Sequence, residues 1–519
     1  MVRRSLSSVR LAEVLGVLAM ATDLGLGLPM EHAIRACLLG VELGRRVGLG
    51  RDELADLYYL TLVRMLGCTV DSGEYAYYFG DEVRFSRDTQ HLDYGDQAAF
   101  GRWVMQSFGA DHPAEVRQRM VDRLFEYSPQ RRQGNLAGHC EVARILANRL
   151  GLSAGVVDGL GYVFERWDGT GVPDGVAGPD HPLIARILAL CNELEVHHRL
   201  SGPAAAIRMA RERSGGAFDP DLVTAFCTDA DDILGRLGLA PLWDELLAAE
   251  PTPHRVADEP TVLAAARVMA DFADLKSPYL TGHSTQVADL AVAAAQRLPD
   301  PGDLVLLRVA ALAHDLGRVG VTAAIWDKPA PLSDVEWESV RLHPYYSERL
   351  LVRSAALAPA AALAGHHHER LDASGYHRGA SAPALSIGAR VLAAADAYLA
   401  MRQARAYRPA LDPDHAGAQL RQLAREGALD AAAVNAVLAA AGDTGPRVRP
   451  PWPAGLTDRE VDVLRRIAAG DSIQQAATQL RVSPKTVDFH LQNLYAKAGV
   501  TTRAAVTLFA VEHGLLPAP

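Results

Sequence analysis

The sequence has few cysteines, no long uncharged run and no excess of positive charge, and each shortage excludes a class of protein. All five cysteines lie in the first half of the chain, and no Cys-x-x-Cys pair is present. This pattern excludes a disulfide framework and indicates reduced thiols. No 18-residue segment is free of charged side chains, so we expect no membrane partner and a cytoplasmic protein. The net charge of −10 means that any contact with DNA has to be local.

Histidines and aspartates gather between His314 and Asp396. His314 and Asp315 follow an apolar helical segment, and His367 and His368 follow a second one. Imidazoles and carboxylates are ligands that iron, manganese and zinc share, and two adjacent ligands at a helix end can face two ions. Paired ions about 3.5–4 Å apart activate a hydroxide and neutralise phosphate oxygens. The pattern therefore predicts a two-metal site for phosphodiester hydrolysis.

Six motifs follow one another in order: Gly282-His283-Ser284, His314-Asp315-Leu316-Gly317, His343-Pro344, His367-His368-Glu369-Arg370, Gly375-Tyr376 and Arg405-Ala406-Tyr407-Arg408-Pro409. Over residues 262–440 they resemble the HD-GYP branch of the HD phosphohydrolases, which are all-helical metal enzymes that cleave cyclic di-GMP. The resemblance implies two divalent ions, iron or manganese, and the metal ligands His283, His314, Asp315, His343, His367, His368 and Asp396. It implies catalytic roles for Asp315 and Arg318. It also implies substrate contacts by Arg370, Gly375, Tyr376, Arg405 and Arg408, of which the last two match phosphate-binding positions.

Three positions depart from the family pattern. Arg318 replaces the usual lysine and keeps the charge without the ammonium geometry. His377 replaces the proline that would stiffen its loop. Tyr279 stands where some members carry the glutamate that adds a third ion, which indicates a dinuclear site. The preference for cyclic di-GMP stays open, and histidines without metal are the alternative that seven candidate ligands in family order argue against.

The first half of the chain is a second copy of this region. Residues 161–171 align without a gap on 365–375, with five of the eleven positions identical. The copy keeps two histidines, and the other ligand positions hold side chains unsuited to a cation. The retained and replaced positions are His32, His139, Arg64, Met65, Val163, Phe164 and Asn192. This copy should be metal-free, and structural duplication and regulatory nucleotide sensing remain equally open. An insertion within residues 75–130 has no readable role.

Prolines mark the linker before the last segment, where 445–453 contains four of them. Beyond it, Thr457 and Glu460 form a capping box, and Ser483-Pro484 starts a third helix after a tight turn. Residues 455–516 resemble the LuxR-type helix-turn-helix, and a protein-interaction module is the alternative. The DNA-facing residues implied are Lys485, Thr486, His490, Asn493 and Lys497. Val487, Leu491 and Leu494 should face the core.

Together these patterns predict an all-α protein, with tandem HD-domain helical bundles followed by a small four-helix LuxR-type helix-turn-helix domain. We expect a degenerate HD-GYP-like domain at 1–250, a phosphohydrolase domain at 251–440, a linker at 441–455 and the DNA-binding domain at 456–519. The main hypothesis is a transcription regulator in which a cyclic dinucleotide controls binding to double-stranded DNA. The alternatives are a phosphodiesterase that its last domain only recruits to DNA, and a nucleotide sensor without turnover. Because the last domain is barely basic, we expect a homodimer on two half-sites.

Overall fold

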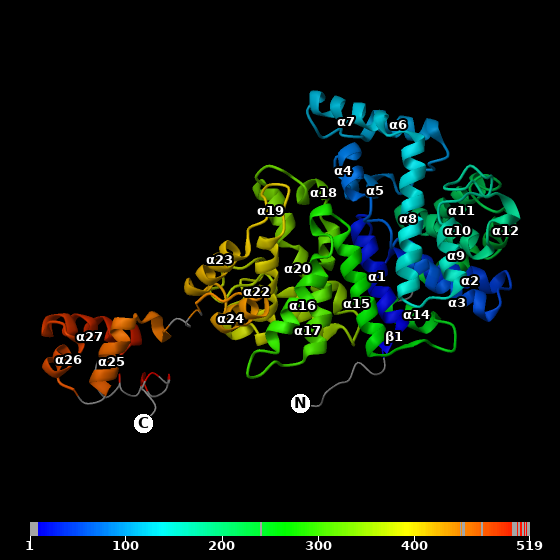
Figure 1. Ribbon diagram of the computed structural model, residues 1–519. Helices are drawn as coiled ribbons and strands as arrows, with labels where there is room; N and C mark the ends of the chain where they lie inside the picture. The colour runs from blue at the N-terminus through cyan, green and yellow to red at the C-terminus, as the bar shows by residue number, and fades with distance from the viewer. Residues whose placement is uncertain are drawn as a thin grey trace.

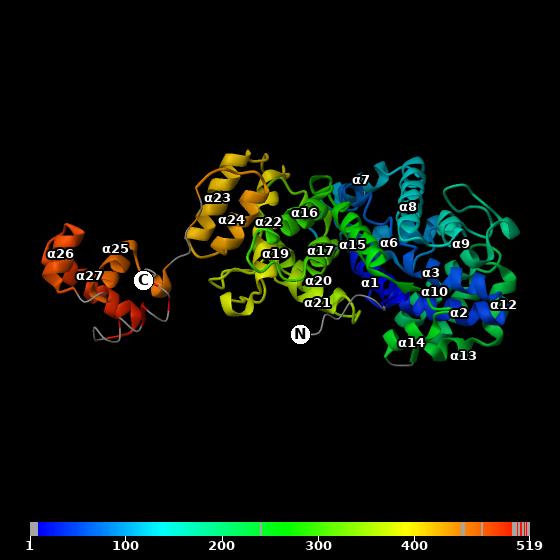
Figure 2. The same cartoon turned by 60° about the horizontal axis from the view of Figure 1, so that its bottom comes forward.

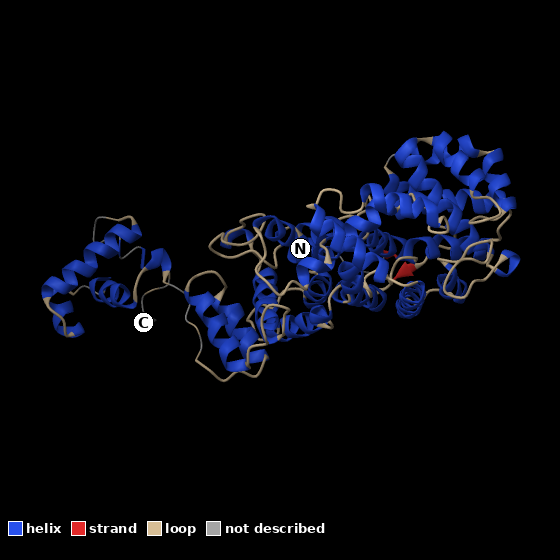
Figure 3. Ribbon diagram, turned by 90° about the horizontal axis from the view of Figure 1, so that it is seen from above, coloured by secondary structure: helices blue, strands red, loops and turns tan. Residues whose placement is uncertain are grey.

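The computed structural model describes residues 9–238, 241–446, 448, 452–468 and 471–500, together with residues 506, 509, 510, 513 and 515. Within these residues the chain is almost entirely helical, as predicted, and its one sheet is a short two-stranded pair (Figures 1 and 3). No helix among them is long and apolar enough to span a bilayer.

The first repeat contains the following elements: β1 Val9–Arg10, α1 Leu11–Gly25, α2 His32–Arg46, α3 Arg51–Val63, α8 Pro129–Arg149, α9 Ala154–Gly159, η1 Leu160–Tyr162, η2 Gly178–Asp180, α10 Leu183–Ser201, α11 Pro203–Glu212, α12 Pro220–Thr228, α13 Ala230–Gly235, η3 Arg236–Gly238 and α14 Leu242–Ala249. The insertion adds α4 Ser72–Phe79, α5 Glu82–Thr89, α6 Gln97–Ser107 and α7 Ala114–Glu126, which enclose a small aromatic core of their own.

The second repeat contains β2 Val256–Ala257, α15 Glu259–Asp274, η4 Pro278–Leu280, α16 His283–Ala295, α17 Leu304–Ala313, η5 Leu316–Gly320, α18 Ala323–Trp326, α19 Asp334–Arg341, α20 His343–Leu351, α21 Ala358–Gly365, η6 Ala382–Ala384, α22 Ile387–Arg402, α23 Pro413–Arg425 and α24 Ala431–Ala440. Side-chain caps start several of these helices. Ser333 and Glu336 form a capping box at the start of α19, the helix that precedes His343.

The two repeats share one hydrophobic core. Helix α1 packs on α15, α20 and η5 of the second repeat, and β1 pairs antiparallel with β2 through Val9 and Ala257. One buried cluster accordingly runs from Val9 to Val448. Figure 2 shows α1 and α15 side by side between the two bundles. The boundary near residue 250 thus divides the repeats along the chain, but burial of apolar surface joins them into one body.

The terminal domain has a separate core. It contains η7 Pro453–Gly455, α25 Asp458–Ala468, α26 Ile473–Leu480 and α27 Pro484–Ala498. Ser483 caps α27 by accepting a hydrogen bond from the Thr486 amide, as predicted. Val487, Leu491 and Leu494 are buried, as expected from their spacing. The predicted fourth helix and the final Gly514 fall largely outside the described residues.

Candidate active site

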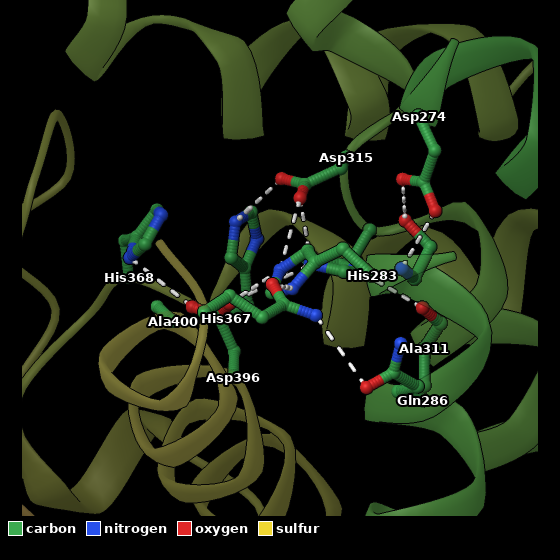
Figure 4. Close-up of polar contacts among 12 residues, drawn as sticks. Asp274, His283, Gln286, Ala311, Asp315, His367, His368, Asp396 and Ala400 are labelled. Carbon is green, nitrogen blue, oxygen red and sulfur yellow. Dashed lines mark hydrogen bonds and ion pairs between the residues drawn. The ribbon is translucent and has the colours of Figure 1, made fainter. Parts of the chain in front are cut away.

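Seven predicted ligands converge from six separate elements of the second repeat. His283 begins α16, His314 and Asp315 join α17 to η5, His343 begins α20, and Asp396 lies within α22. His367 and His368 directly follow α21. Figure 4 shows the labelled side chains pointing toward one another. All are fully buried except His368, which is partly buried.

Short contacts link the converging atoms. Nε2 of His314 and Nε2 of His343 lie 3.0 and 3.2 Å from the Asp315 carboxylate. Nε2 of His283 lies 3.1 Å from Asp396 Oδ1, and Nδ1 of His368 lies 3.7 Å from Asp396 Oδ2. The atoms form three overlapping sets in which every ligand atom is within 4.8 Å of the others: His343, His367 and His368; His283, His314 and Asp396; and His314, Asp315 and His367.

The backbone orients three of the imidazoles for coordination. In His314, His343 and His367, Nδ1 lies 2.6–2.7 Å from the carbonyl oxygen three residues earlier, so it carries the proton. Each Nε2 lone pair is then free to bind a cation, which is the usual arrangement of metal-ligating histidine. Nε2 of His343 and Nε2 of His367 are only 3.1 Å apart with no proton to share. A cation between them satisfies both.

Unsatisfied polar atoms support the same conclusion. Among the described residues, neither Asp315 oxygen, nor His314 Nε2, nor His368 Nδ1 completes a hydrogen bond. Arg318 Nε lies 2.9 Å from Asp315 Oδ1, which makes an ion pair without hydrogen-bond geometry. Buried polar atoms without partners are rare because desolvation is costly. The residues present therefore fit a metal centre.

The electrostatics of the site keep its two carboxylates and His367 in the form that binds metal. Burial opposes protonation of His314, but the Asp315 carboxylate raises the pKa of that imidazole. Burial alone would raise the pKa of Asp315, but Arg318 and His314 hold it well below its usual range. The pKa of Asp396 is lowered in the same way, against burial, mainly by its hydrogen bond with His283. Burial lowers the pKa of His367 to about 4. Carboxylates stay charged and this imidazole stays neutral at neutral pH, as coordination requires.

A cavity of about 510 Å³ opens beside the ligands. Tyr376 and Arg405 line it, and the Tyr376 ring lies 4.3 Å from the His368 ring. Arg408 also lines it, but its guanidinium donates to four backbone carbonyls, among them Met401 at 3.3 Å. Two predicted substrate residues are not among those that line the cavity. They are Arg370, which donates to the Glu369 carbonyl, and Gly375, where any Cβ would lie 2.6 Å from the Glu369 backbone.

The inserted segment reaches the surroundings of this site through Glu82. Glu82 accepts hydrogen bonds from Thr322 Oγ1 (2.5 Å) and the Ala323 amide (2.9 Å), and its carboxylate lies 2.6 Å from Lys276 Nζ. Thr322 caps α18, whose last residue is Trp326. Lys276 is 1% exposed. The first repeat thus contributes a buried charge to the support of the second.

Trp326 connects that support to the metal ligands. Its indole N–H donates to the Arg318 carbonyl at 3.2 Å, and the Arg318 guanidinium lies 5.0 Å from the Trp326 ring centroid. Arg318 in turn contacts Asp315 at 2.9 Å. No spacing rule predicts this series of contacts, because Glu82 is 240 residues from Thr322 in the sequence.

The equivalent place in the first repeat is built differently. Nη2 of Arg64 lies 2.9 Å from His32 Nε2, where the second repeat has the candidate metal ligands His314 and His283. His139 lies 3.0 Å from the Arg64 carbonyl oxygen and packs edge-on against Phe164. A guanidinium and an aromatic ring replace two ligands, so these residues do not form a ligand set.

The predicted DNA-facing residues lie along α27. Lys485 is exposed near its start, and Thr486, His490 and Asn493 are partly exposed. Lys497 lies near the other end, where its Nζ contacts Glu460 Oε2 at 2.8 Å. Its charge is therefore partly neutralised within the domain.

Comparison with known proteins agrees with this description. An HD domain family model matches residues 126–222 and 267–433, and a model of bacterial regulatory proteins of the luxR family matches 454–510. The 3'3'-cGAMP-specific phosphodiesterase 3 of Vibrio cholerae is 29% identical over 411 residues, which are 78% of this chain and 89% of that protein. A cyclic di-GMP phosphodiesterase of Thermotoga maritima is 36% identical over 20% of this chain and 28% of its own length.

Two further similarities concern the terminal domain and the whole fold. A probable transcriptional regulatory protein NarL of Mycobacterium tuberculosis is 44% identical over 87 residues, which are 17% of this chain and 40% of that protein. A crystal structure of a V. cholerae cyclic GMP-AMP-specific phosphodiesterase superposes with a TM-score of 0.58 at 26% identity, covering 85% of this chain and 99% of that one.

Proposed function

The chain belongs to the HD-domain family and carries a luxR-family regulatory domain, and from this premise we propose that it hydrolyses a cyclic dinucleotide and controls transcription accordingly. The observation that carries the proposal is the convergence of seven candidate ligands, six of them buried, beside a cavity of about 510 Å³. The similarity to enzymes named for 3'3'-cGAMP and cyclic di-GMP supports a cyclic dinucleotide as the substrate class.

We propose that the site holds two divalent ions, iron or manganese. When bound, such a pair supplies a hydroxide nucleophile and neutralises phosphate oxygens. Asp315 would help to hold the two ions, because its carboxylate belongs to the ligand set of His314 and His367 and contacts His343 at 3.2 Å. The mixed imidazole and carboxylate donors suit both metals.

Residues of the cavity would bind and orient the substrate. Arg405 lines the cavity, and the hydrogen bonds of its side chain within the described chain all leave from Nη1, which donates to the Tyr279 and Ala404 carbonyls and to Gln403 Oε1. Burial lowers its pKa to about 10, so it stays charged at neutral pH. It is the residue best placed to grip a phosphate. Tyr376, Trp326 and Tyr407 provide aromatic surfaces for bases. Arg408 would act mainly by closing the end of α22, because its donors are used by carbonyls.

The test of hydrolysis uses the full-length protein reconstituted with iron or manganese under reducing conditions. We expect 3'3'-cGAMP or cyclic di-GMP to be converted to a linear product, which chromatography separates, and we expect Asp315→Asn to abolish conversion. A metal-loaded protein that converts neither compound would contradict the enzymatic proposal and favour a sensor without turnover.

We further propose that the protein acts as a homodimer on double-stranded DNA in the cytoplasm. Two copies of α27 on half-sites about one helical turn apart would supply the affinity that one weakly basic domain lacks. A ligand can shift this assembly only by binding one state better than the other. Gel shifts of full-length protein and isolated residues 452–519, with and without cyclic di-GMP, test it. An identical ligand response in both would contradict control of DNA binding by the ligand. The remaining alternative would be an enzyme that its last domain only recruits to DNA.

A further inference from the structure

The first repeat contains a second cavity, of about 330 Å³, in the place that corresponds to the catalytic cavity. His32, Arg64, Phe164 and Asn192, which occupy former ligand positions, line it on one side. The loop after α5, including Tyr94, lines it on the other. The positions that correspond to the metal ligands of the second repeat therefore face an open chamber in the first repeat.

Four arginines and three carboxylates line this chamber, and one of the carboxylates, Glu165, accepts hydrogen bonds from backbone amides. Two of its arginines are paired, Arg166 with Asp93 at 2.6 Å and Arg213 with Glu193 at 3.0 Å. The remaining two, Arg64 and Arg132, have no carboxylate within ion-pair distance among the residues that the structure describes.

Arg64 is only partly satisfied, because its Nη2 contacts His32 Nε2 at 2.9 Å while the rest of its guanidinium has no carboxylate partner among the described residues. Its Nε is buried and lacks any hydrogen-bond partner in the described chain. Arg132 instead lies over the Tyr94 ring, with 5.4 Å between its guanidinium carbon and the ring centroid. Both arginines are partly buried, and a guanidinium withdrawn from water without a counter-ion is costly, so an anion bound beside them would be favourable. A guanidinium suits the oxygens of phosphate, to which it can donate two parallel hydrogen bonds.

The other walls of the chamber suit a nucleobase. Tyr94, Phe164 and Phe218 line it, and a base can stack on such rings. Its volume lies at the lower end of the range for small-molecule sites, about 300–1,000 Å³, and is smaller than that of the catalytic cavity. This favours one nucleotide over two.

We propose that the chamber of the first repeat binds a mononucleotide, with its phosphate on Arg64 and Arg132 and its base on the aromatic wall. The bound nucleotide is not hydrolysed, because the chamber lacks a set of metal ligands. The proposal does not depend on hydrolysis in the second repeat, so either can fail alone.

Titration calorimetry of the full-length protein with GMP and with AMP tests the proposal. We expect at least one of them to bind, and Arg132→Met to weaken that binding about ten-fold or more through loss of a charge-assisted contact. Arg119→Met is the matched control, because Arg119 is exposed on α7 and does not line the chamber. It should bind as the unchanged protein does.

Two further variants distinguish binding in the chamber from binding in the catalytic cavity. Arg405→Met, in the catalytic cavity, should leave mononucleotide affinity unchanged. Arg64→Met should keep or raise the melting temperature without nucleotide, because it removes a partly buried charge that has no carboxylate partner in the described chain, and should lose the increase that GMP or AMP causes.

Several results would overturn the assignment. These are no binding of either nucleotide, a loss of affinity in Arg405→Met but not in Arg132→Met, and equal affinity in Arg132→Met and Arg119→Met. Binding of inorganic phosphate as tight as that of GMP and AMP would show an anion site without base recognition, and would also refute it.

Discussion

Removal of the Glu82 carboxylate should destabilise the protein and impair catalysis together. Glu82 is 5% exposed, and the ammonium of Lys276 that it neutralises is 1% exposed. Glu82→Ala leaves that ammonium buried without its partner, and breaking a buried pair in this way costs about 3–5 kcal/mol. It also removes the acceptor of the Thr322 hydroxyl and the Ala323 amide at the start of α18.

The catalytic consequence follows from what α18 supports. Trp326 at its end packs against Arg318, which contacts Asp315 at 2.9 Å. A displaced α18 would therefore move Asp315, the residue proposed to be catalytic. Misplacement of a reacting group by about 1 Å can lower the rate about 100-fold. We expect Glu82→Ala to lower kcat/KM for a cyclic dinucleotide by at least ten-fold. Glu82→Gln keeps the hydrogen-bond acceptor but not the charge, so its kcat/KM should lie between the values of Glu82→Ala and the unchanged protein.

The assay combines urea denaturation, followed by circular dichroism, with hydrolysis measured under conditions where the variants remain folded. Asp111→Ala is the control, because its ion pair with Arg84 is exposed on the same insertion. Asp111→Ala should change neither the free energy of unfolding nor kcat/KM. Glu82→Leu combined with Lys276→Met removes both charges and should recover much of the lost stability. The coupling through Glu82 is refuted if Glu82→Ala unfolds at the same urea concentration as Asp111→Ala and retains full kcat/KM.

Three further predictions concern other parts of the molecule. His343→Ala should lower metal content measured by plasma mass spectrometry, whereas His139→Ala should not, and equal losses would show that the first repeat also binds metal. Lys485→Ala should weaken binding on all DNA sequences and lower the salt slope by about one in titrations at several salt concentrations, and an unchanged slope would exclude its phosphate contact. Burial lowers the pKa of His139 to about 4, so the unfolded chain binds more protons between pH 4 and 6.5 and stability falls as the pH falls through that window. His139→Gln should therefore lose roughly 2 kcal/mol less than the unchanged protein between pH 7 and pH 5 in urea denaturation, and equal losses would contradict this.

Local patterns in the sequence were sufficient to identify the helices and to group the candidate ligands. Apolar side chains that recur every three to four residues, capping boxes and adjacent ligand pairs are properties of short stretches of sequence, and the cap predicted at Ser483 is present. Self-alignment likewise revealed the duplication, because the repeats retain the same residue types at equal spacing. The family matches confirm an HD region and a luxR-type domain, while the roles of single residues stay predictions.

Tertiary structure alone decided how distant residues act on one another. The shared core of the two repeats, the buried pair of Glu82 and Lys276, and the unpaired charge of Arg64 depend on helices that lie far apart in the chain. A carboxylate at position 82 has the sequence pattern of an ordinary solvated side chain, because its burial arises only when the insertion packs against the second repeat. Whether a charge is exposed, paired or unpaired is a property of the folded surroundings, and a sequence pattern does not contain it.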